Sequence, residues 1–199
     1  MSKKIINLPE FKTVGEVSLE SALKNRKSVR DFKDDALSLE QVSQVLWAAH
    51  GVSHGDNYYT VPSAGALFPL EIYLIAEKVE DLAQGLYHYL PIGHKVEMIN
   101  SGSFLKTVSN VAYGQRALSH CPAIFIISGV VARSEKKYRE RALRYVQFEV
   151  GHAGQNILLQ AAALGLASVP MGAFIDDQVK ERLGMEGEPF YLLPVGYEK

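Results

Sequence analysis

The sequence predicts an α+β fold rather than a doubly wound parallel sheet. Candidate strands and helices are interspersed along the chain without the regular strand–helix–strand alternation that a parallel sheet requires. The chain has 199 residues, of which 47% are hydrophobic, and this is enough for one sizeable core. We therefore expect residues 1–199 to form a single domain with helices packed on a sheet.

Two helices are predicted in the first quarter of the chain. Residues 17–27 have a helical pattern, with Ser18 as the N-cap. A second helix opens at Ser38, whose capping box closes with Gln41, and Gly51 ends it. The apolar face of this second helix, spaced by three and four residues, comprises Val42, Val45, Leu46 and Ala49. Residues 54–66 are expected to form a polar loop.

The apolar runs in the rest of the chain predict buried strands. The strongest signals are Leu70–Ala76 and residues 123–128, which are rich in β-branched and other apolar side chains. Shorter strands are expected at residues 85–89, 95–99, 166–169 and 190–195. Helices are expected at residues 103–112, in one long stretch from 138 to 164, and after Asp176, which we expect to cap a short helix.

Composition excludes several functional classes. With 21 basic and 22 acidic residues, the chain has no electrostatic signature of nucleic-acid or anionic-membrane binding. A single cysteine, Cys121, excludes a disulfide framework, and the six scattered histidines predict no metal site. The uncharged residues 152–175 include polar side chains and Pro170, so they indicate a buried helix and turn rather than a membrane span. No N-terminal signal is visible, and we expect a cytoplasmic protein.

One catalytic motif matches by letter only. Gly51-Val52-Ser53-His54-Gly55 fits the G-x-S-x-G nucleophile elbow, which requires a strand before the serine and a helix after it. Here a predicted helix precedes the motif and a loop follows, so a hydrolase is not expected. Neither a G-x-G-x-x-G fingerprint after a strand nor a P-loop is present, and any nucleotide must bind by another route.

Three segments carry residues suited to a ligand. Arg26, Ser28 and Arg30 alternate, so in an extended segment they share one side, and two guanidiniums beside a hydroxyl suit a phosphate. The alternative is a solvated basic helix end that complements the macrodipole. Two turns made of small residues would let the backbone of the chain approach a flat ligand closely. Each turn is equally well explained as an ordinary connection between two secondary-structure elements. The two turns consist of Pro62, Ser63, Ala64 and Gly65, and of Pro170, Met171, Gly172 and Ala173.

Together these segments resemble the nitroreductase family, whose members bind FMN without a Rossmann fingerprint. The resemblance runs from Arg26 to Gly196. Its sharpest part is Lys137-Tyr138-x-x-Arg141-x-x-Arg144-Tyr145, continuing into Gly151-His152-x-x-Gln155-Asn156. With the Ser63-Ala64-Gly65-Ala66-Leu67 loop, this is similar to the SagB-type branch, relatives of the azoline dehydrogenases that mature peptide heterocycles.

The resemblance implies a sandwich with a central, mainly antiparallel sheet flanked by helices, in an interlocked homodimer. It implies that Arg26 and Ser28 bind the FMN phosphate and that Arg30 approaches the pyrimidine side or the ribityl chain. It further implies that the loop from Pro62 to Gly65 reaches the flavin from the partner subunit. The turn from Pro170 to Ala173 would pass near flavin N5, with Gly172 N–H as the donor. Gln115 would lie at the pyrimidine edge of the ring, and Lys199 would lie near the phosphate. Many relatives carry an acidic side chain in the turn from Pro170 to Ala173, and this chain has none.

The resemblance also suggests catalytic residues. Lys137 and Tyr138 match the Lys–Tyr pair associated with proton removal in azoline dehydrogenases, the alternative being a helix-start lysine beside a core tyrosine. The leading hypothesis is an FMN-dependent oxidoreductase that takes hydride from NADH or NADPH and passes it to nitro compounds, quinones or similar small acceptors by a ping-pong mechanism. Two alternatives remain, a dehydrogenase that oxidises an azoline-like substrate to an azole and a flavin-binding module without turnover.

Overall fold

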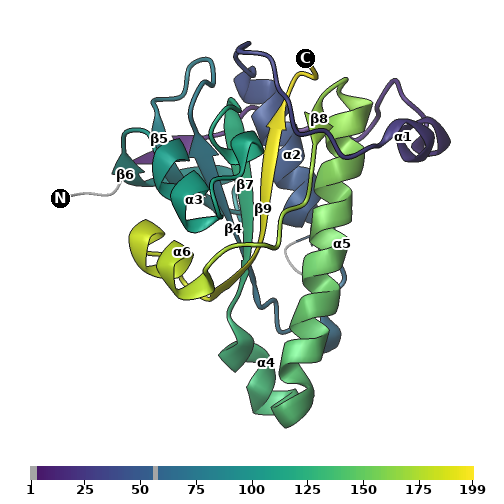
Figure 1. Ribbon diagram of the computed structural model, residues 1–199. Helices are drawn as coiled ribbons and strands as arrows, with labels where there is room; N and C mark the ends of the chain where they lie inside the picture. Colours follow the sequence, from purple (N-terminus) through teal and green to yellow (C-terminus); the bar gives the residue numbers. More distant parts are fainter. Residues whose placement is uncertain (1–3, 56–57) are drawn as a thin grey trace.

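The structure, a computed structural model that describes residues 4–55 and 58–199, is built around a seven-stranded sheet with helices on both faces (Figure 1). The strand order is β1-β6-β5-β4-β7-β9-β8, and every neighbouring pair is antiparallel. The strands are β1 (Ile5–Asn7), β4 (Leu70–Ala76), β5 (Gly85–Leu90), β6 (Lys95–Ser101), β7 (Ala123–Gly129), β8 (Ala167–Ser168) and β9 (Glu188–Gly196). The predicted α+β class is confirmed.

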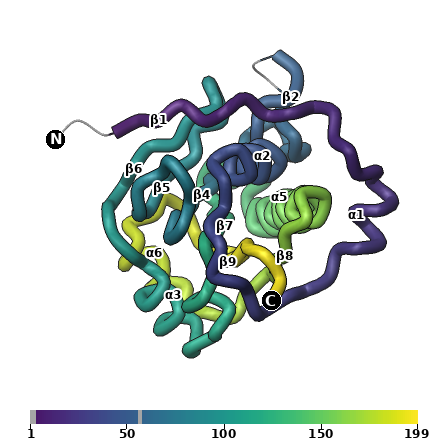
Figure 2. The backbone as a smooth tube through the Cα atoms, turned by 90° about the horizontal axis from the view of Figure 1, so that it is seen from above, coloured from purple at the N-terminus to yellow at the C-terminus, as the bar shows by residue number. Residues whose placement is uncertain are grey.

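Two pairs of helices cover the two faces of the sheet. One face carries α2 (Leu39–His50) and α5 (Ala142–Ala163), and the other carries α3 (Leu105–Val111) and α6 (Asp176–Leu183) (Figure 2). Two further helices, α1 (Leu19–Asn25) and α4 (Val131–Tyr138), lie at opposite ends of α5 (Figure 1). The capping box predicted at the start of α2 is present, and Gly51 ends that helix as expected.

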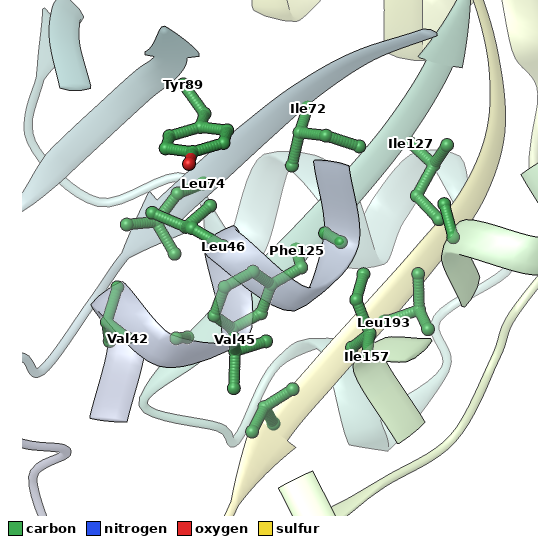
Figure 3. Packing of buried hydrophobic residues seen from close by; sticks show 14 of the residues in the cluster. Val42, Val45, Leu46, Ile72, Leu74, Tyr89, Phe125, Ile127, Ile157 and Leu193 are labelled. Carbon is green, nitrogen blue, oxygen red and sulfur yellow. The ribbon is translucent and has the colours of Figure 1, made fainter. Parts of the chain in front are cut away.

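The central strand β7 divides the core into two layers. All seven of its residues are buried, and successive side chains point to opposite faces. Phe125 and Ile127 belong to the cluster under α2 and α5, whereas Ile124 and Ile126 belong to the cluster under α3 and α6. Figure 3 shows Phe125 and Ile127 in the first cluster, beside Val45, Leu46, Ile157 and Leu193. Each fully buried side chain of this size contributes about 1.5–3 kcal/mol.

The single long helix predicted for residues 138–164 is present as α5, but it begins four residues later than predicted. The chain forms α4, then a short 3₁₀ turn η4 (Arg139–Arg141), then α5. The break lies at Arg139, whose φ of 49° and ψ of −126° are incompatible with an α-helix. Lys137 and Tyr138 consequently end one helix instead of opening the next.

Two smaller expectations also need correction, and a third is met. Asp176 is the first residue of α6, and the N-cap is Ile175, which makes no side-chain capping bond. Part of the predicted loop at 54–66 forms secondary structure. β2 (Val52–His54) pairs with β3 (Tyr58–Tyr59), and η2 (Ala64–Ala66) is a 3₁₀ turn. Residues 56–57 of that loop lie outside the described residues. Ser53 sits in β2 after a helix, so the nucleophile-elbow context is absent at that serine, as expected.

Because the ring of His50, the last residue of α2, is buried, we expect the free energy of unfolding to depend on pH. The ring stacks on Tyr59 at 4.7 Å, and Nδ1 has no hydrogen-bond partner among the described residues. Burial lowers the pKa of His50 to about 4; the charge of Glu71 opposes this shift and that of Arg133 adds to it. As pH falls from about 6.5 to 4, the unfolded chain binds a proton that the folded chain does not, so stability falls by up to about 3 kcal/mol.

His50→Phe is expected to remove this component of the acid sensitivity. The measurement is urea unfolding of both proteins at several pH values between 7.5 and 4.5. The stability of the wild type should decline more steeply with falling pH than that of the variant. Equal slopes would contradict a buried neutral histidine.

Candidate functional site

The segment that begins with Arg26 docks beside β8. Arg26 caps the end of α1, its backbone N–H donating to the carbonyl of Ala22. Ser28 then pairs in parallel with Ser168, and Val29 N–H donates to the Ser168 carbonyl at 3.1 Å. Val29 is buried, whereas Ser28 and Arg30 are exposed, in keeping with the predicted alternation.

A cavity of about 260 Å³ lies next to Arg26. Its lining includes Arg26, Lys27, Leu158, Gly165, Ser168 and Glu198. Lys27 Nζ is paired with Glu198 Oε1 at 2.7 Å, so its charge is already partly compensated. Ser168 is 3% exposed, and its hydroxyl has no hydrogen-bond partner among residues 4–55 and 58–199. A guanidinium near an unpaired buried hydroxyl suits an oxygen-rich anion such as a phosphate.

The turn from Pro170 to Ala173 follows β8 directly. Met171 is fixed to β9 by two backbone hydrogen bonds with Leu192, at 3.0 and 2.9 Å. Gln115 Nε2 donates to the Ala173 carbonyl at 2.8 Å, so the structure brings this predicted residue to the turn. Gly172 is exposed, and its N–H donates to no acceptor in the described part of the chain. The turn therefore offers a free backbone donor.

Arg30 and Lys199 lie at a second cavity, separate from the one next to Arg26. Both line a larger cavity of about 650 Å³, which Arg26 does not line. Lys199 N–H donates to the Asp31 carbonyl at 3.2 Å, and Arg116 Nε lies 3.4 Å from Asp31 Oδ1. Lys199 is thus beside Arg30 rather than in the cavity next to Arg26.

The loop from Pro62 to Gly65 is held in an unusual backbone conformation. Gly65 has a φ of 66°, and the non-glycine residues Ala66 and Phe68 follow with φ of 53° and 44°. Ala64 N–H donates to Glu149 Oε1 at 2.8 Å, and Phe68 N–H donates to Ser63 Oγ at 3.0 Å. Non-glycine residues rarely adopt positive φ unless surrounding contacts enforce it.

Lys137 and Tyr138, the two predicted catalytic residues, lie against Gly65. A Cβ added at Gly65 would lie 2.8 Å from Tyr138 Oη and 2.9 Å from Lys137 Nζ. The Tyr138 ring also meets the Tyr145 ring edge-on at 4.6 Å. A side chain at Gly65 would be strained at this φ and would displace the ends of the Tyr138 and Lys137 side chains.

The predicted site residues, with Ser168 and Glu149 added by the structure, fall into two sets. The first, called the Arg26 group, contains Arg26, Ser28, Gln115, Ser168 and the turn from Pro170 to Ala173, with Arg30 and Lys199 at the neighbouring cavity. The second, called the Gly65 group, contains Pro62, Ser63, Ala64, Gly65, Lys137, Tyr138 and Glu149.

The two groups contact different parts of α5. Leu158 lines the cavity next to Arg26, while Glu149 binds the loop of the Gly65 group. Leu158 follows Glu149 by nine positions, which corresponds to about 13 Å along the helix axis. Figure 1 shows α1, which leads into Arg26, at one end of α5 and α4, which carries Lys137 and Tyr138, at the other. Within one chain, the structure does not bring the predicted residues into one site.

Glu149 was not among the site residues predicted from the sequence. The helical spacing holds the missing signal, because Glu149 follows Val146 by three residues and precedes Ala153 by four, on the buried face of α5. Burial raises the pKa of Glu149, against the opposing effects of the Ala64 N–H, the Ser63 side chain and His152.

The described residues form neither a metal-binding cluster nor a membrane-spanning helix. Among the described residues, no group of three or more histidine, cysteine, aspartate or glutamate side chains could hold a metal ion. No helix within residues 4–55 and 58–199 is both long and apolar enough to cross a bilayer.

Comparison with known proteins gives a consistent result. The model of the nitroreductase family matches residues 23–197. A Methanocaldococcus jannaschii protein named as a nitroreductase is 38% identical over 191 residues, which cover 96% of this chain and 95% of that protein. The microcin B17-processing protein McbC of Escherichia coli is 26% identical over 196 residues, 93% of this chain and 71% of McbC. A crystal structure from Ralstonia eutropha, also named as a nitroreductase, superposes with a TM-score of 0.84 at 25% identity, covering 98% of this chain and 90% of the other. The chain belongs to the nitroreductase family, a family of oxidoreductases.

Proposed function

We propose that this chain is an FMN-dependent oxidoreductase that works as a homodimer and uses NADH or NADPH to reduce nitro compounds, quinones or similar small acceptors. The observation that carries the proposal is the division of the predicted cofactor-binding residues between two separate places along α5. A two-fold axis that sets two α5 helices side by side in antiparallel directions would bring the Arg26 group of one chain to the Gly65 group of the other. Each of the two equivalent sites would then use both chains.

The Arg26 group has the chemistry that FMN requires. Arg26 would hold the phosphate from the cavity that it lines with Ser168, and Ser28, which pairs with Ser168, would bind the phosphate beside this cavity. The free N–H of Gly172 would donate to a flavin ring nitrogen, with Gln115 close by through its bond to Ala173. When bound, FMN supplies the hydride-transfer chemistry, and the part of the protein is to bind the ring and orient it.

An exposed apolar face of α5 supports association with a second copy. Leu143 is 47% exposed and Phe148 56% exposed, and the exposed Gly151 follows Phe148 within one turn. Leu19 and Leu23 on α1 add further exposed apolar surface at the opposite end of α5. A second copy of the chain would remove these side chains from water, and the absence of a side chain at Gly151 would let the two helices approach closely.

Mixed dimers test whether the site is shared. Arg26→Ala is expected to impair the Arg26 group, and Gly65→Ala the Gly65 group, because alanine is strained at this φ and its Cβ would displace the ends of Tyr138 and Lys137. Each homodimer should be impaired in NADH-driven quinone reduction. When the two chains are co-expressed with different tags, every mixed dimer carries one doubly altered site and one intact site, so about a quarter of all sites should recover. A site formed within one chain would instead give no recovery.

A second function is favoured by the position of Lys137 and Tyr138. Both side chains cover Gly65, in the loop proposed to face the flavin of the partner subunit. The similarity to McbC, a microcin B17-processing protein, supports the same alternative, a dehydrogenase that oxidises an azoline-like substrate to an azole. In this reaction Lys137 and Tyr138 would accept the substrate proton while hydride leaves for the flavin.

Anaerobic stopped-flow reduction distinguishes these functions. Rapid bleaching of the FMN absorbance by NADH or NADPH would support the reductase. Bleaching by a thiazoline or oxazoline peptide, with slow reduction by both nicotinamides, would support the dehydrogenase. Bound FMN that none of these donors reduces would identify a flavin-binding module without turnover.

A further inference from the structure

The loop from Pro62 to Phe68 holds its shape through contacts with distant parts of the chain. It contains three residues with positive φ, Gly65, Ala66 and Phe68, and two of them have a side chain that disfavours this conformation. The Ser63 hydroxyl fixes one end by accepting from Phe68 N–H, a local bond that the loop supplies itself. A second local bond runs from Ala66 N–H to the Ser63 carbonyl at 3.1 Å, and two more come from helices, α5 through Glu149 and α4 through Arg133.

Arg133 links the loop to α4. Its Nη1 donates to the Phe68 carbonyl at 3.0 Å, and its Nη2 pairs with Glu71, which in turn is 2.6 Å from His88 Nε2. Arg133 lies one helical turn before Lys137, so the guanidinium that fixes the end of the loop also fixes the helix carrying Lys137 and Tyr138.

Glu149 fixes the middle of the loop from a buried position. The residue is 3% exposed, and Oε1 accepts from Ala64 N–H at 2.8 Å, directly before the glycine that Lys137 and Tyr138 cover. Oε2 has no hydrogen-bond partner within the described part of the chain. Burying a carboxyl group is unfavourable, and an aliphatic residue would pack at this position on α5 without that cost. The bond from Ala64 N–H requires a hydrogen-bond acceptor at this position, which an aliphatic residue lacks.

We infer that Glu149 is a positioning residue, whose bond to Ala64 sets the backbone of residues 63–65 so that this loop binds the flavin of the partner subunit. This inference rests on the proposed function, because the loop acts across the subunit boundary only in a shared site. Glu149 does not touch the cofactor and acts through the loop of its own chain.

Three variants test the role of the acceptor. Glu149→Leu keeps the volume and loses the acceptor, and it is expected to raise the FMN dissociation constant about tenfold. Glu149→Gln keeps an oxygen that accepts from Ala64 N–H, and it should restore affinity to within about threefold of the wild type. Glu140→Gln removes an exposed carboxylate from η4 and should leave affinity unchanged. Thermal unfolding without FMN shows that each variant is folded before its affinity is compared.

Mixed dimers assign the defect to one side of the site. Co-expressed with Arg26→Ala, the Glu149→Leu chain should recover FMN binding and turnover, because one site of the mixed dimer is intact. Co-expressed with Gly65→Ala, it should recover neither, because both changes affect the same group of residues. A structural role would not produce this pattern, since destabilisation of one chain is independent of which partner is altered.

The outcomes separate the inference from the proposed function. Failure of Arg26→Ala and Gly65→Ala to complement each other would overturn the shared site itself. If that pair complements, an unchanged FMN affinity in Glu149→Leu would overturn the role of Glu149, as would recovery with Gly65→Ala or a defect in Glu149→Gln as large as that in Glu149→Leu.

Discussion

Arg26→Ala is expected to weaken FMN binding by about ten- to a hundredfold while the fold remains intact. A charge-assisted contact with the phosphate contributes roughly 1.5–3 kcal/mol, which corresponds to this change in the dissociation constant. Arg26 lines the cavity with the unpaired Ser168 hydroxyl, and its backbone N–H continues to cap α1 in the variant. The measurement is fluorescence titration of the apoprotein with FMN, with circular dichroism as the check on folding.

A matched arginine on α6 provides the control for Arg26. Arg182→Ala removes the same charge from an exposed position in the last turn of that helix, and FMN affinity should not change. If Arg26→Ala and Arg182→Ala both leave the affinity at the wild-type value, Arg26 is a solvated helix end that complements the macrodipole.

Tyr138→Phe is expected to abolish oxidation of an azoline substrate while FMN stays bound and NADH or NADPH still reduces it. The variant loses only the hydroxyl that lies over Gly65, and this group is the proposed proton acceptor of the dehydrogenase. Turnover with a quinone should barely change, because a quinone takes hydride and then draws its proton from water. Steady-state rates with both substrates measure the difference.

Tyr145→Phe is the control for Tyr138→Phe. Tyr145 contacts the Tyr138 ring, and Tyr145→Phe removes the same kind of hydroxyl group. The atoms nearest to a Cβ at Gly65 belong to Tyr138 and Lys137, not to Tyr145. Azoline oxidation should therefore survive in Tyr145→Phe. A Tyr138→Phe protein that no longer binds FMN would assign Tyr138 to packing and would support neither function.

Elements with local signals were predicted well. The capping box of Ser38 and Gln41 fixed the start of α2, and the apolar run of β4 has the predicted bounds, Leu70–Ala76. These features depend on neighbouring residues in the chain, so the sequence displays them directly. The predicted strand at 123–128 differs from β7 by one residue for the same reason.

Elements decided by tertiary contacts were predicted poorly. The break between α4 and α5 lies at Arg139, where no glycine or proline marks the positive φ. Asp176 has the side chain of an N-cap, yet the backbone places Ile175 in that position. In both cases the surrounding structure outweighs a local preference of the sequence.

The candidate site shows the same division. The alternation of Arg26, Ser28 and Arg30 could be identified from the sequence, but the pairing of Ser28 with Ser168 joins residues 140 positions apart. Glu149 is buried because of what α5 packs against, and nothing in its immediate neighbourhood marks it as a partner of Ala64. Long-range pairing of this kind is visible only in the folded chain.

The separation of the two groups along α5 has a thermodynamic consequence for the proposed dimer. When a ligand contacts both subunits, its binding and their association are linked, and each strengthens the other by the same free energy. Dilution that dissociates the dimer should therefore release FMN, and added FMN should shift the monomer–dimer equilibrium towards the dimer. The apparent cofactor affinity then depends on protein concentration, so at low expression the amount of active enzyme would fall more steeply than the amount of chain.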